Sequence, residues 1–177
     1  MEPTVERQEI INGEIAMCPA PSDEHQFGVG DLFRLLDNHA HANRAGFVLM
    51  APVDVVIRRA PALQVRQPDL AFWSVARVGG NTRADFKSAR GGGLAPDLAI
   101  ELLSPEETRR RLASKLADYA SIGVLEVWLV GQQTETVEIL RLESGAYVRA
   151  GLYGSGDVVR SAVLPDLEIA VDELFQE

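Results

Sequence analysis

The first hydrophobic pattern along the chain is that of a hairpin. The pair Asn12-Gly13 separates two short apolar runs, 9–11 and 14–17. Both central positions of the tightest hairpin turn need positive φ, which asparagine and glycine adopt readily. The chain is therefore predicted to open with a β-hairpin over 9–17.

A helical period follows the hairpin. Between Phe27 and Ala40 apolar residues recur at steps of three to four, and Ser22 or Asp23 is placed to cap the first turn. This pattern predicts a helix over 24–43.

Gly46 is predicted to end that helix, and short apolar runs follow it. Pro68 lies inside the last run, which indicates a sheet edge or a strand start because proline cannot donate to a ladder. The predicted strands are 47–50, 53–57 and 65–73. Residues 74–96 show no clear period and contain two glycine clusters, so they are predicted to be a long loop, either functional or disordered.

The clearest pattern is a strand, a helix and a strand over 98–130. The near-continuous apolar runs 98–103 and 124–130 predict two buried strands, and the helix between them makes these strands parallel with a right-handed crossover. The helix signals are Ser104 as N-cap, Pro105 at the first position, Glu107 at the third, and Gly123 as the stop after Ile122.

The C-terminal part of the chain is predicted to be mostly strands. These cover 136–142, 146–151 and a short segment near Val158, and a helical turn follows over 171–175. The length and the whole pattern predict a single α/β (α+β) domain over 1–177.

Composition limits the classes of protein that are possible. The 177 residues are 46% hydrophobic and carry 26 acidic against 17 basic side chains, a net charge of -9. This acidity argues against a general nucleic-acid coat protein or a binder of anionic membranes, although it leaves room for a local basic groove. Cys18 is the single cysteine, and no leader-like or membrane-spanning apolar run occurs. We expect a cytoplasmic protein that has no disulfide and does not bind membranes.

Two charged residues stand where apolar ones are expected. Glu101 interrupts a strand that should be buried on both faces, and Lys115 lies on the inward stripe of the next helix. Glu101 is about 10 Å below the start of that helix at ~3.3 Å per strand residue. Lys115 is about 16 Å below it at ~1.5 Å per helical residue, so the two side chains can meet.

Asp69 is a third candidate, because it follows Pro68 at the start of an apolar run. Two carboxylates from neighbouring strands beside a lysine make an oxygen-ligand site for Mg²⁺, with Mn²⁺ as an alternative. Such a site supports metal-assisted phosphodiester hydrolysis. Two structural readings stay open: Glu101 and Lys115 could form a buried ion pair without catalysis, and Asp69 could be a turn or cap residue.

The order of these residues resembles the Uma2 family (DUF820) of restriction-endonuclease-like proteins. The residues that carry the resemblance are Pro68-Asp69, the segment 96–105, Lys115, Tyr119-Ala120, Gly123-Val124 and Glu126-Val127-Trp128. Further matches are Ile11-Asn12-Gly13-Glu14, Glu24-His25-Gln26, Ala51-Pro52-Val53-Asp54 and Leu164-Pro165-Asp166-Leu167. The resemblance implies a restriction-endonuclease-like core of the PD-(D/E)XK superfamily, with a mixed β-sheet flanked by helices.

The resemblance also implies roles for individual residues. Asp69 and Glu101 match the two metal-binding acids, while Leu103 stands where the superfamily usually has its lysine. In Uma2 proteins that lysine lies on the following helix, which is where Lys115 stands. Glu14 and His25 match family positions near the site, and Glu14 is expected to assist as a further metal or water ligand.

Some of these assignments have plain alternatives. Glu14 could be an ordinary strand residue, His25 a helix cap, and Asp54 either a neighbour of the site or a solvent-facing charge. Arg111 replaces a family acid and extends the basic run 109–111, which is either a solvated helix face or a phosphate-contacting patch.

The sequence thus predicts an endonuclease that depends on Mg²⁺ or Mn²⁺ and acts on nucleic acid, with DNA as the expected substrate. A homodimer is expected because paired nuclease units cut both strands. The alternative is a catalytically inactive homodimeric binding or scaffold protein that keeps the same fold.

Overall fold

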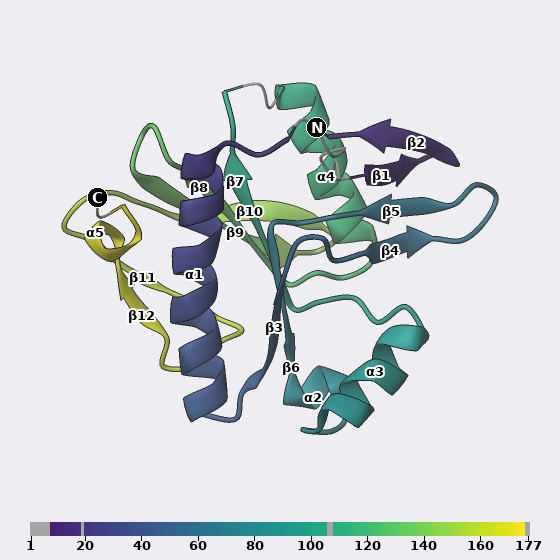
Figure 1. Cartoon of the computed structure of the whole chain (residues 1–177), viewed down its shortest axis with the longest axis horizontal. Coiled ribbons are helices and arrows are strands. Elements are labelled where there is room, and N and C mark those ends of the chain that lie inside the picture. The colour runs from purple at the N-terminus through teal and green to yellow at the C-terminus, as the bar shows by residue number, and fades with distance from the viewer. Residues whose placement is uncertain (1–7, 19, 106–107, 176–177) are drawn as a thin grey trace, which may run out of the picture.

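A mixed sheet of six strands forms the centre of the molecule (Figure 1). The computed structural model describes residues 8–18, 20–105 and 108–175. In spatial order the strands are β10 (Ala146–Tyr153), β9 (Thr136–Glu143), β8 (Glu126–Gly131), β7 (Leu98–Leu103), β6 (Leu70–Ser74) and β3 (Gly46–Met50). Within this sheet only β7 and β8 run parallel, which confirms the predicted strand–helix–strand unit and the mixed sheet.

The remaining strands form two smaller sheets. One has the order β2 (Glu14–Met17), β1 (Gln8–Ile11), β5 (Gln64–Arg66) and β4 (Val55–Arg58), and the other pairs β11 (Val158–Arg160) with β12 (Glu168–Ala170). β1 and β2 form the predicted hairpin, since Asn12 and Gly13 have φ of 53° and 85°. The sequence pattern did not indicate β12.

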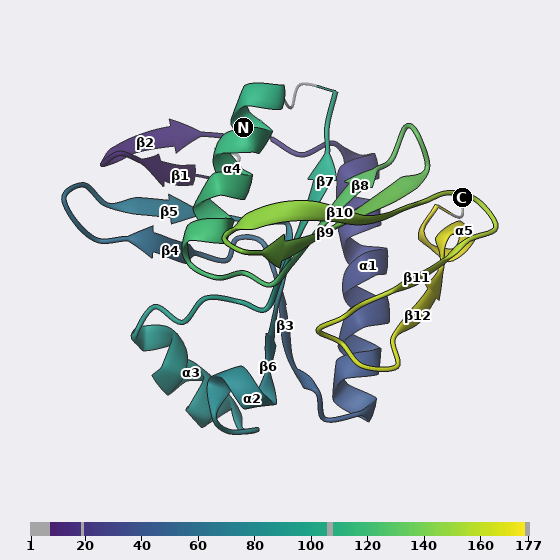
Figure 2. The same ribbon diagram turned by 180° about the vertical axis from the view of Figure 1, so that it is seen from behind.

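The described residues form five helices, and the two longest cover opposite faces of the central sheet (Figures 1 and 2). The helices are α1 (Asp23–Ala42), α2 (Val75–Val78), α3 (Arg83–Gly91), α4 (Arg109–Ser121) and α5 (Val171–Leu174). Side chains alternate along β7, so Leu98 and Ile100 pack in the core beneath α1, whereas Ala99 packs with Tyr119 of α4. Glu101 shares the parity of Ala99 and therefore faces α4.

The predicted strand over 65–73 is wrong, because the chain changes sheets within it. β5 and β6 belong to different sheets, and Gln67, Pro68 and Asp69 connect them. Pro68 has no backbone N–H and cannot continue a ladder. The break matters for function, since it brings Asp69 to the start of β6.

The predicted start of the helix between β7 and β8 is also wrong. α4 begins at Arg109, and the Thr108 side chain caps it by accepting a hydrogen bond from the Arg111 N–H at 3.2 Å. Ser104 and Pro105 precede the helix, and Glu107 lies outside the described residues. The stop is confirmed, because the helix ends at Ser121 and Gly123 has a φ of 77°.

The segment 74–96 is not a structureless loop, contrary to the prediction. It holds α2 and α3, and α3 starts with a reciprocal capping box between Thr82 and Asp85. Phe86 anchors α3 by stacking on Phe47 with 4.7 Å between ring centroids. These helices are too short to show a helical period in the sequence.

One smaller difference concerns the end of α1. α1 ends at Ala42 with Asn43 as its C-cap, and Gly46 already belongs to β3, so Gly46 is not the helix stop. No helix in the described part of the chain has the length and apolar character that crossing a bilayer requires.

Candidate active site

A buried ion pair joins β7 to α4. Lys115 Nζ donates a hydrogen bond to Glu101 Oε2 at 2.7 Å, and both side chains are almost fully buried. One turn further along α4, the Tyr119 hydroxyl donates to Glu101 Oε1 at 2.6 Å. The contact between Glu101 and Lys115 that the strand and helix rises predicted is therefore present. Tyr119, which holds the second oxygen, was not singled out from the sequence as a site residue.

Asp69 lies beside Glu101 at the start of β6. The pairing of Leu70 with Ile100, continued by one residue, sets Asp69 opposite Glu101. Asp69 Oδ2 accepts a hydrogen bond from the Leu102 N–H at 2.7 Å, which fixes the carboxylate against β7. Its Oδ1 lies 3.3 Å from Nε2 of His25 in the first turn of α1. The structure thus brings His25 to the predicted pair of acids.

The electrostatics of the site reflect two acids in a confined space. Burial raises the pKa of Glu101, and so does the neighbouring charge of Asp69, while Lys115 and Tyr119 act in the opposite direction. Burial and the adjacent Glu101 raise the pKa of the Tyr119 hydroxyl well above its usual value, so this hydroxyl is a neutral donor. A cation placed between the two acids would relieve their repulsion.

His25 and the two acids line one pocket of about 430 Å³, together with Lys115. Asp69, Glu101 and Lys115 form its floor with exposed fractions of 2%, 4% and 5%. Cys18 and Arg111 also line this pocket, and Arg111 Nη2 lies 2.9 Å from Cys18 Sγ. Of the basic run 109–111, Arg111 is the residue that reaches the pocket.

Lys115 is the first of a row of buried or partly buried side chains whose charges alternate in sign. Lys115 Nζ lies 3.9 Å from Glu9 Oε1, and Glu9 Oε2 lies 3.0 Å from Arg66 Nη1. Arg66 Nε in turn donates to Asp118 Oδ2 at 2.6 Å. The exposed fraction of Glu9 is only 1%, although it belongs to the first hairpin. Glu9 was missed from the sequence because nothing in its strand separates it from a solvent-facing acid.

Two predicted residues lie elsewhere. Glu14 is exposed on β2, opposite Ile11, and does not line the pocket. Asp54 is also exposed, and its Oδ1 accepts a hydrogen bond from Gln67 Nε2 at 2.8 Å. No contact in the described structure therefore supports the assisting role expected for Glu14.

Other buried carboxylates have structural roles. Glu126 accepts hydrogen bonds from Trp128 Nε1 at 2.9 Å and the Ala162 N–H at 3.0 Å, which ties the C-terminal segment to β8. Asp97 accepts from the Ser74 N–H at 2.7 Å and from Arg77 Nε at 2.6 Å. Burial of an acid by itself therefore does not identify a catalytic residue here.

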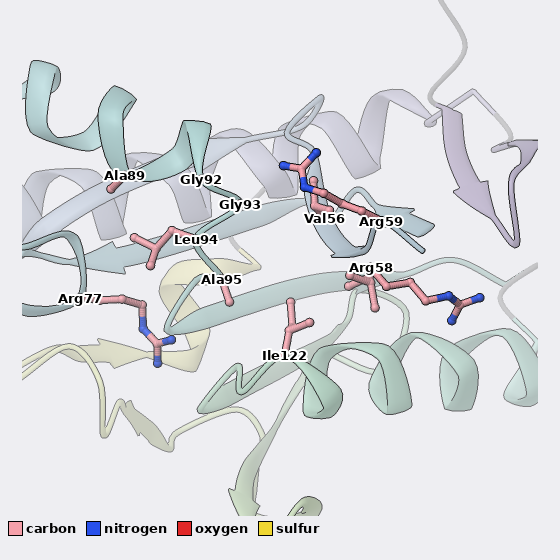
Figure 3. Close-up of a pocket in the computed structure, with 11 residues that line it drawn as sticks. Val56, Arg58, Arg59, Arg77, Ala89, Gly92, Gly93, Leu94, Ala95 and Ile122 are labelled. Carbon is pink, nitrogen blue, oxygen red and sulfur yellow. The ribbon is translucent and has the colours of Figure 1, made fainter. Parts of the chain in front are cut away.

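A separate groove of about 590 Å³ contains arginines and no carboxylate (Figure 3). Arg59, which follows β4, and Arg77 of α2 both line it, and Arg77 is bound to Asp97. This groove lacks the acids that metal-assisted hydrolysis needs, so the candidate chemistry belongs to the pocket of Asp69 and Glu101.

Comparison with known families bears on the function of this pocket. Residues 1–172 match the family model Uma2, which is described as "Putative restriction endonuclease". The chain belongs to the Uma2 family. No curated protein matches its sequence.

A solved structure shares the fold of this Uma2 protein. It is the crystal structure of a putative nuclease belonging to DUF820 from Anabaena variabilis ATCC 29413. The match covers 99% of this chain and 93% of the other at a TM-score of 0.72, with 16% sequence identity. At that identity the likeness shows the fold, and it agrees with the mixed α+β fold predicted from the sequence.

Proposed function

We propose that this Uma2 protein is a divalent-metal-dependent endonuclease that hydrolyses phosphodiester bonds of nucleic acid, with DNA as its substrate. Its catalytic unit is one domain over 1–177. The observation that carries the proposal is the convergence of Asp69, Glu101 and Lys115 in one pocket, with 2.7 Å between Lys115 Nζ and Glu101 Oε2.

The donor set fits a hard cation. Among the described residues no group of three or more histidines, cysteines and acids has the arrangement of a metal site. Mg²⁺ needs fewer protein ligands than that, because it typically binds one or two carboxylates and keeps several waters. Asp69 and Glu101 supply two carboxylates, and the charge of Asp69 raises the pKa of Glu101. They would hold Mg²⁺, or Mn²⁺ in its place.

The reaction is hydrolysis of a phosphodiester. A water oxygen forms a bond to phosphorus, the ester P–O bond breaks, and the departing alkoxide oxygen takes up a proton. When bound, the ion lowers the pKa of water and neutralises charge on the phosphoryl group. The Lys115 ammonium group, fixed by Glu101, stabilises the negative charge that develops on the phosphoryl oxygens. Tyr119 and the Leu102 N–H orient the two acids.

Cleavage of supercoiled plasmid and of single-stranded RNA by the purified protein tests the proposal. We expect plasmid cleavage with Mg²⁺ or Mn²⁺ and none in EDTA. Asp69→Asn and Glu101→Gln should each abolish it, while Asp54→Asn, an exposed acid outside the pocket, should not. Cleavage of RNA alone would contradict the choice of DNA. If Asp69→Asn cleaved as well as the parent, the assignment of the catalytic site to this pocket would be wrong.

A catalytically inactive binding protein is the second candidate. It is favoured by one observation: both Glu101 oxygens already accept hydrogen bonds from Lys115 and Tyr119, as in a purely structural ion pair. Calorimetric titration with Mg²⁺ and Mn²⁺ separates the two candidates. Binding that disappears in Asp69→Asn supports the enzyme, and the lack of any carboxylate-dependent binding supports the inactive protein.

Three further expectations belong to the proposal. A homodimer would place two sites on one duplex, and light scattering on the eluted protein measures the mass directly. A cytoplasmic location stays a prediction that fractionation would check. Glu14 also stays a predicted assisting residue, and Glu14→Ala should lower cleavage if the hairpin approaches the substrate.

A further inference from the structure

β3 ends the central sheet, and one of its edges carries no partner strand among the described residues. The Val75 N–H donates to Ala45 O and the Ala51 N–H donates to Asp69 O. Every second residue between Ala45 and Ala51 therefore bonds to β6. Along a strand of an antiparallel pair, the backbone N–H and C=O groups of one residue bond to the neighbouring strand and those of the next residue point away from it. The N–H and C=O groups of Gly46, Val48 and Met50 therefore point outward from the sheet.

A groove of about 1150 Å³ runs beside this edge. It lies between α1 and α3, which stand on opposite sides of β3 (Figures 1 and 2). Phe33 of α1, Phe47 of β3 and Phe86 of α3 give it an apolar interior. An extended chain in this groove would be covered on both faces by side chains of the protein.

The rim of the groove is basic in a protein whose net charge is -9. Arg44, Arg83 and Lys87 line it and are exposed to solvent. Arg90 adds a fourth cation, 5.0 Å above the ring of Trp73, while Asp37 is the one carboxylate among the lining residues. The local charge is therefore opposite in sign to that of the whole chain.

We propose that the β3 groove binds an extended acidic peptide segment of a partner protein, which adds to the central sheet as a further strand. Strand addition uses main-chain hydrogen bonds for affinity and alternate side chains for specificity. The side chains of the added strand would point in turn toward α1 and toward α3. Carboxylates facing α3 meet Arg83 and Lys87, and those facing α1 meet Arg44.

Two other occupants fit less well. A second copy paired through β3 would bring Arg44, Arg83 and Lys87 close to the same cations of its partner, which like-charge repulsion opposes. A nucleic-acid backbone presents phosphate oxygens, which only accept hydrogen bonds, so the outward carbonyls of β3 would lose their donors. A peptide backbone supplies donors and acceptors in alternation.

Fluorescence anisotropy with the full chain tests this proposal. The probe is a labelled eight-residue peptide of alternating glutamate and valine with blocked ends. We expect saturable binding that weakens with salt. The same peptide with every amide N-methylated keeps its charge but cannot donate, and should bind at least about tenfold more weakly. Replacing its glutamates by lysine should remove binding.

Matched variants locate the binding surface. Arg83→Glu combined with Lys87→Glu should weaken binding at least about tenfold, because both side chains are exposed on the groove rim. Arg109→Glu combined with Arg110→Glu reverses two exposed charges on α4 outside the groove and should leave binding unchanged. The proposal does not rest on nuclease activity, which the variant at residues 83 and 87 should retain.

Several results would overturn the proposal. Equal affinity for the N-methylated peptide would show that charge alone attracts the probe. Tighter binding of a single-stranded oligonucleotide to the same rim would assign the groove to nucleic acid. A dimer whose dissociation follows the Arg83→Glu and Lys87→Glu changes would assign it to a second copy.

Discussion

Lys115 Nζ lies 2.7 Å from Glu101 Oε2, although one residue belongs to α4 and the other to β7. Tyr119, one turn along α4, holds the second oxygen of the same carboxylate. A single helix face therefore sets the position of the buried acid. This arrangement leads to predictions that separate catalysis from stability.

Lys115→Met should abolish most of the activity and also destabilise the protein. We expect cleavage to fall by about 10²–10³-fold, as for the loss of a group that stabilises transition-state charge. Leaving Glu101 buried without its partner costs up to about 3–5 kcal/mol of unfolding free energy, less to the extent that Glu101 takes up a proton. Urea unfolding and plasmid cleavage measure the two effects. Lys87→Met, at an exposed site, is the control, and parental cleavage in Lys115→Met would exclude the proposed role.

On acidification, the affinity for Mg²⁺ should begin to fall at a higher pH than it would if the site contained a solvated glutamate. Burial and the charge of Asp69 raise the pKa of Glu101, so its carboxylate takes up a proton at a higher pH than a solvated one. Only the ionised form binds the metal well, so affinity is present above the raised pKa and falls as the pH drops through it. Calorimetry with Mg²⁺ between pH 8 and pH 5 measures this. A constant affinity over that range would contradict the prediction.

Tyr119→Phe should shift that pH dependence upward. The hydroxyl donates to Glu101 Oε1 and favours its ionised form, so its loss raises the pKa of Glu101 further. The midpoint for metal binding should then move to higher pH, and the unfolding free energy should fall by about 1–3 kcal/mol. Tyr147→Phe is the matched control, because that hydroxyl bonds to Val124 O at 2.7 Å and not to Glu101. An equal shift in both variants would show that the effect is indirect.

Glu126→Ala should affect stability and leave the chemistry intact. Its loss removes the acceptor for Trp128 Nε1 and the Ala162 N–H, at a cost of about 1–3 kcal/mol. Hydrogen exchange should become faster over 158–170, where β11 and β12 are attached. Cleavage per folded molecule should equal that of the parent. A selective loss of activity would show that this acid also serves the site.

Duplex binding should be weak when no divalent metal is present. The chain has a net charge of -9, and the pocket adds the acids Asp69 and Glu101 where a phosphate would approach. Anisotropy with a labelled duplex should show affinity in Ca²⁺ that EDTA removes. Asp69→Asn in EDTA should bind slightly better than the parent because one repelling charge is gone. Tight parental binding in EDTA would contradict the prediction.

The sequence by itself determined the strand–helix–strand unit and the meeting of Glu101 with Lys115. Both follow from short-range regularities, since the rise per residue of a strand and of a helix fixes how far each side chain lies from the connecting turn. The hairpin at Asn12-Gly13 is predictable for the same reason: it depends on the backbone preferences of two adjacent residues.

Only the tertiary structure decided which acid of the first hairpin is buried. Glu9 and Glu14 stand in neighbouring strands of one hairpin, yet Glu9 is buried between Lys115 and Arg66 while Glu14 is exposed. The difference arises from the docking of β1 against β5, a contact between segments more than fifty residues apart. The burial of Glu9 and its contacts with Lys115 and Arg66 depend on such distant contacts, and no local pattern in the sequence encodes them.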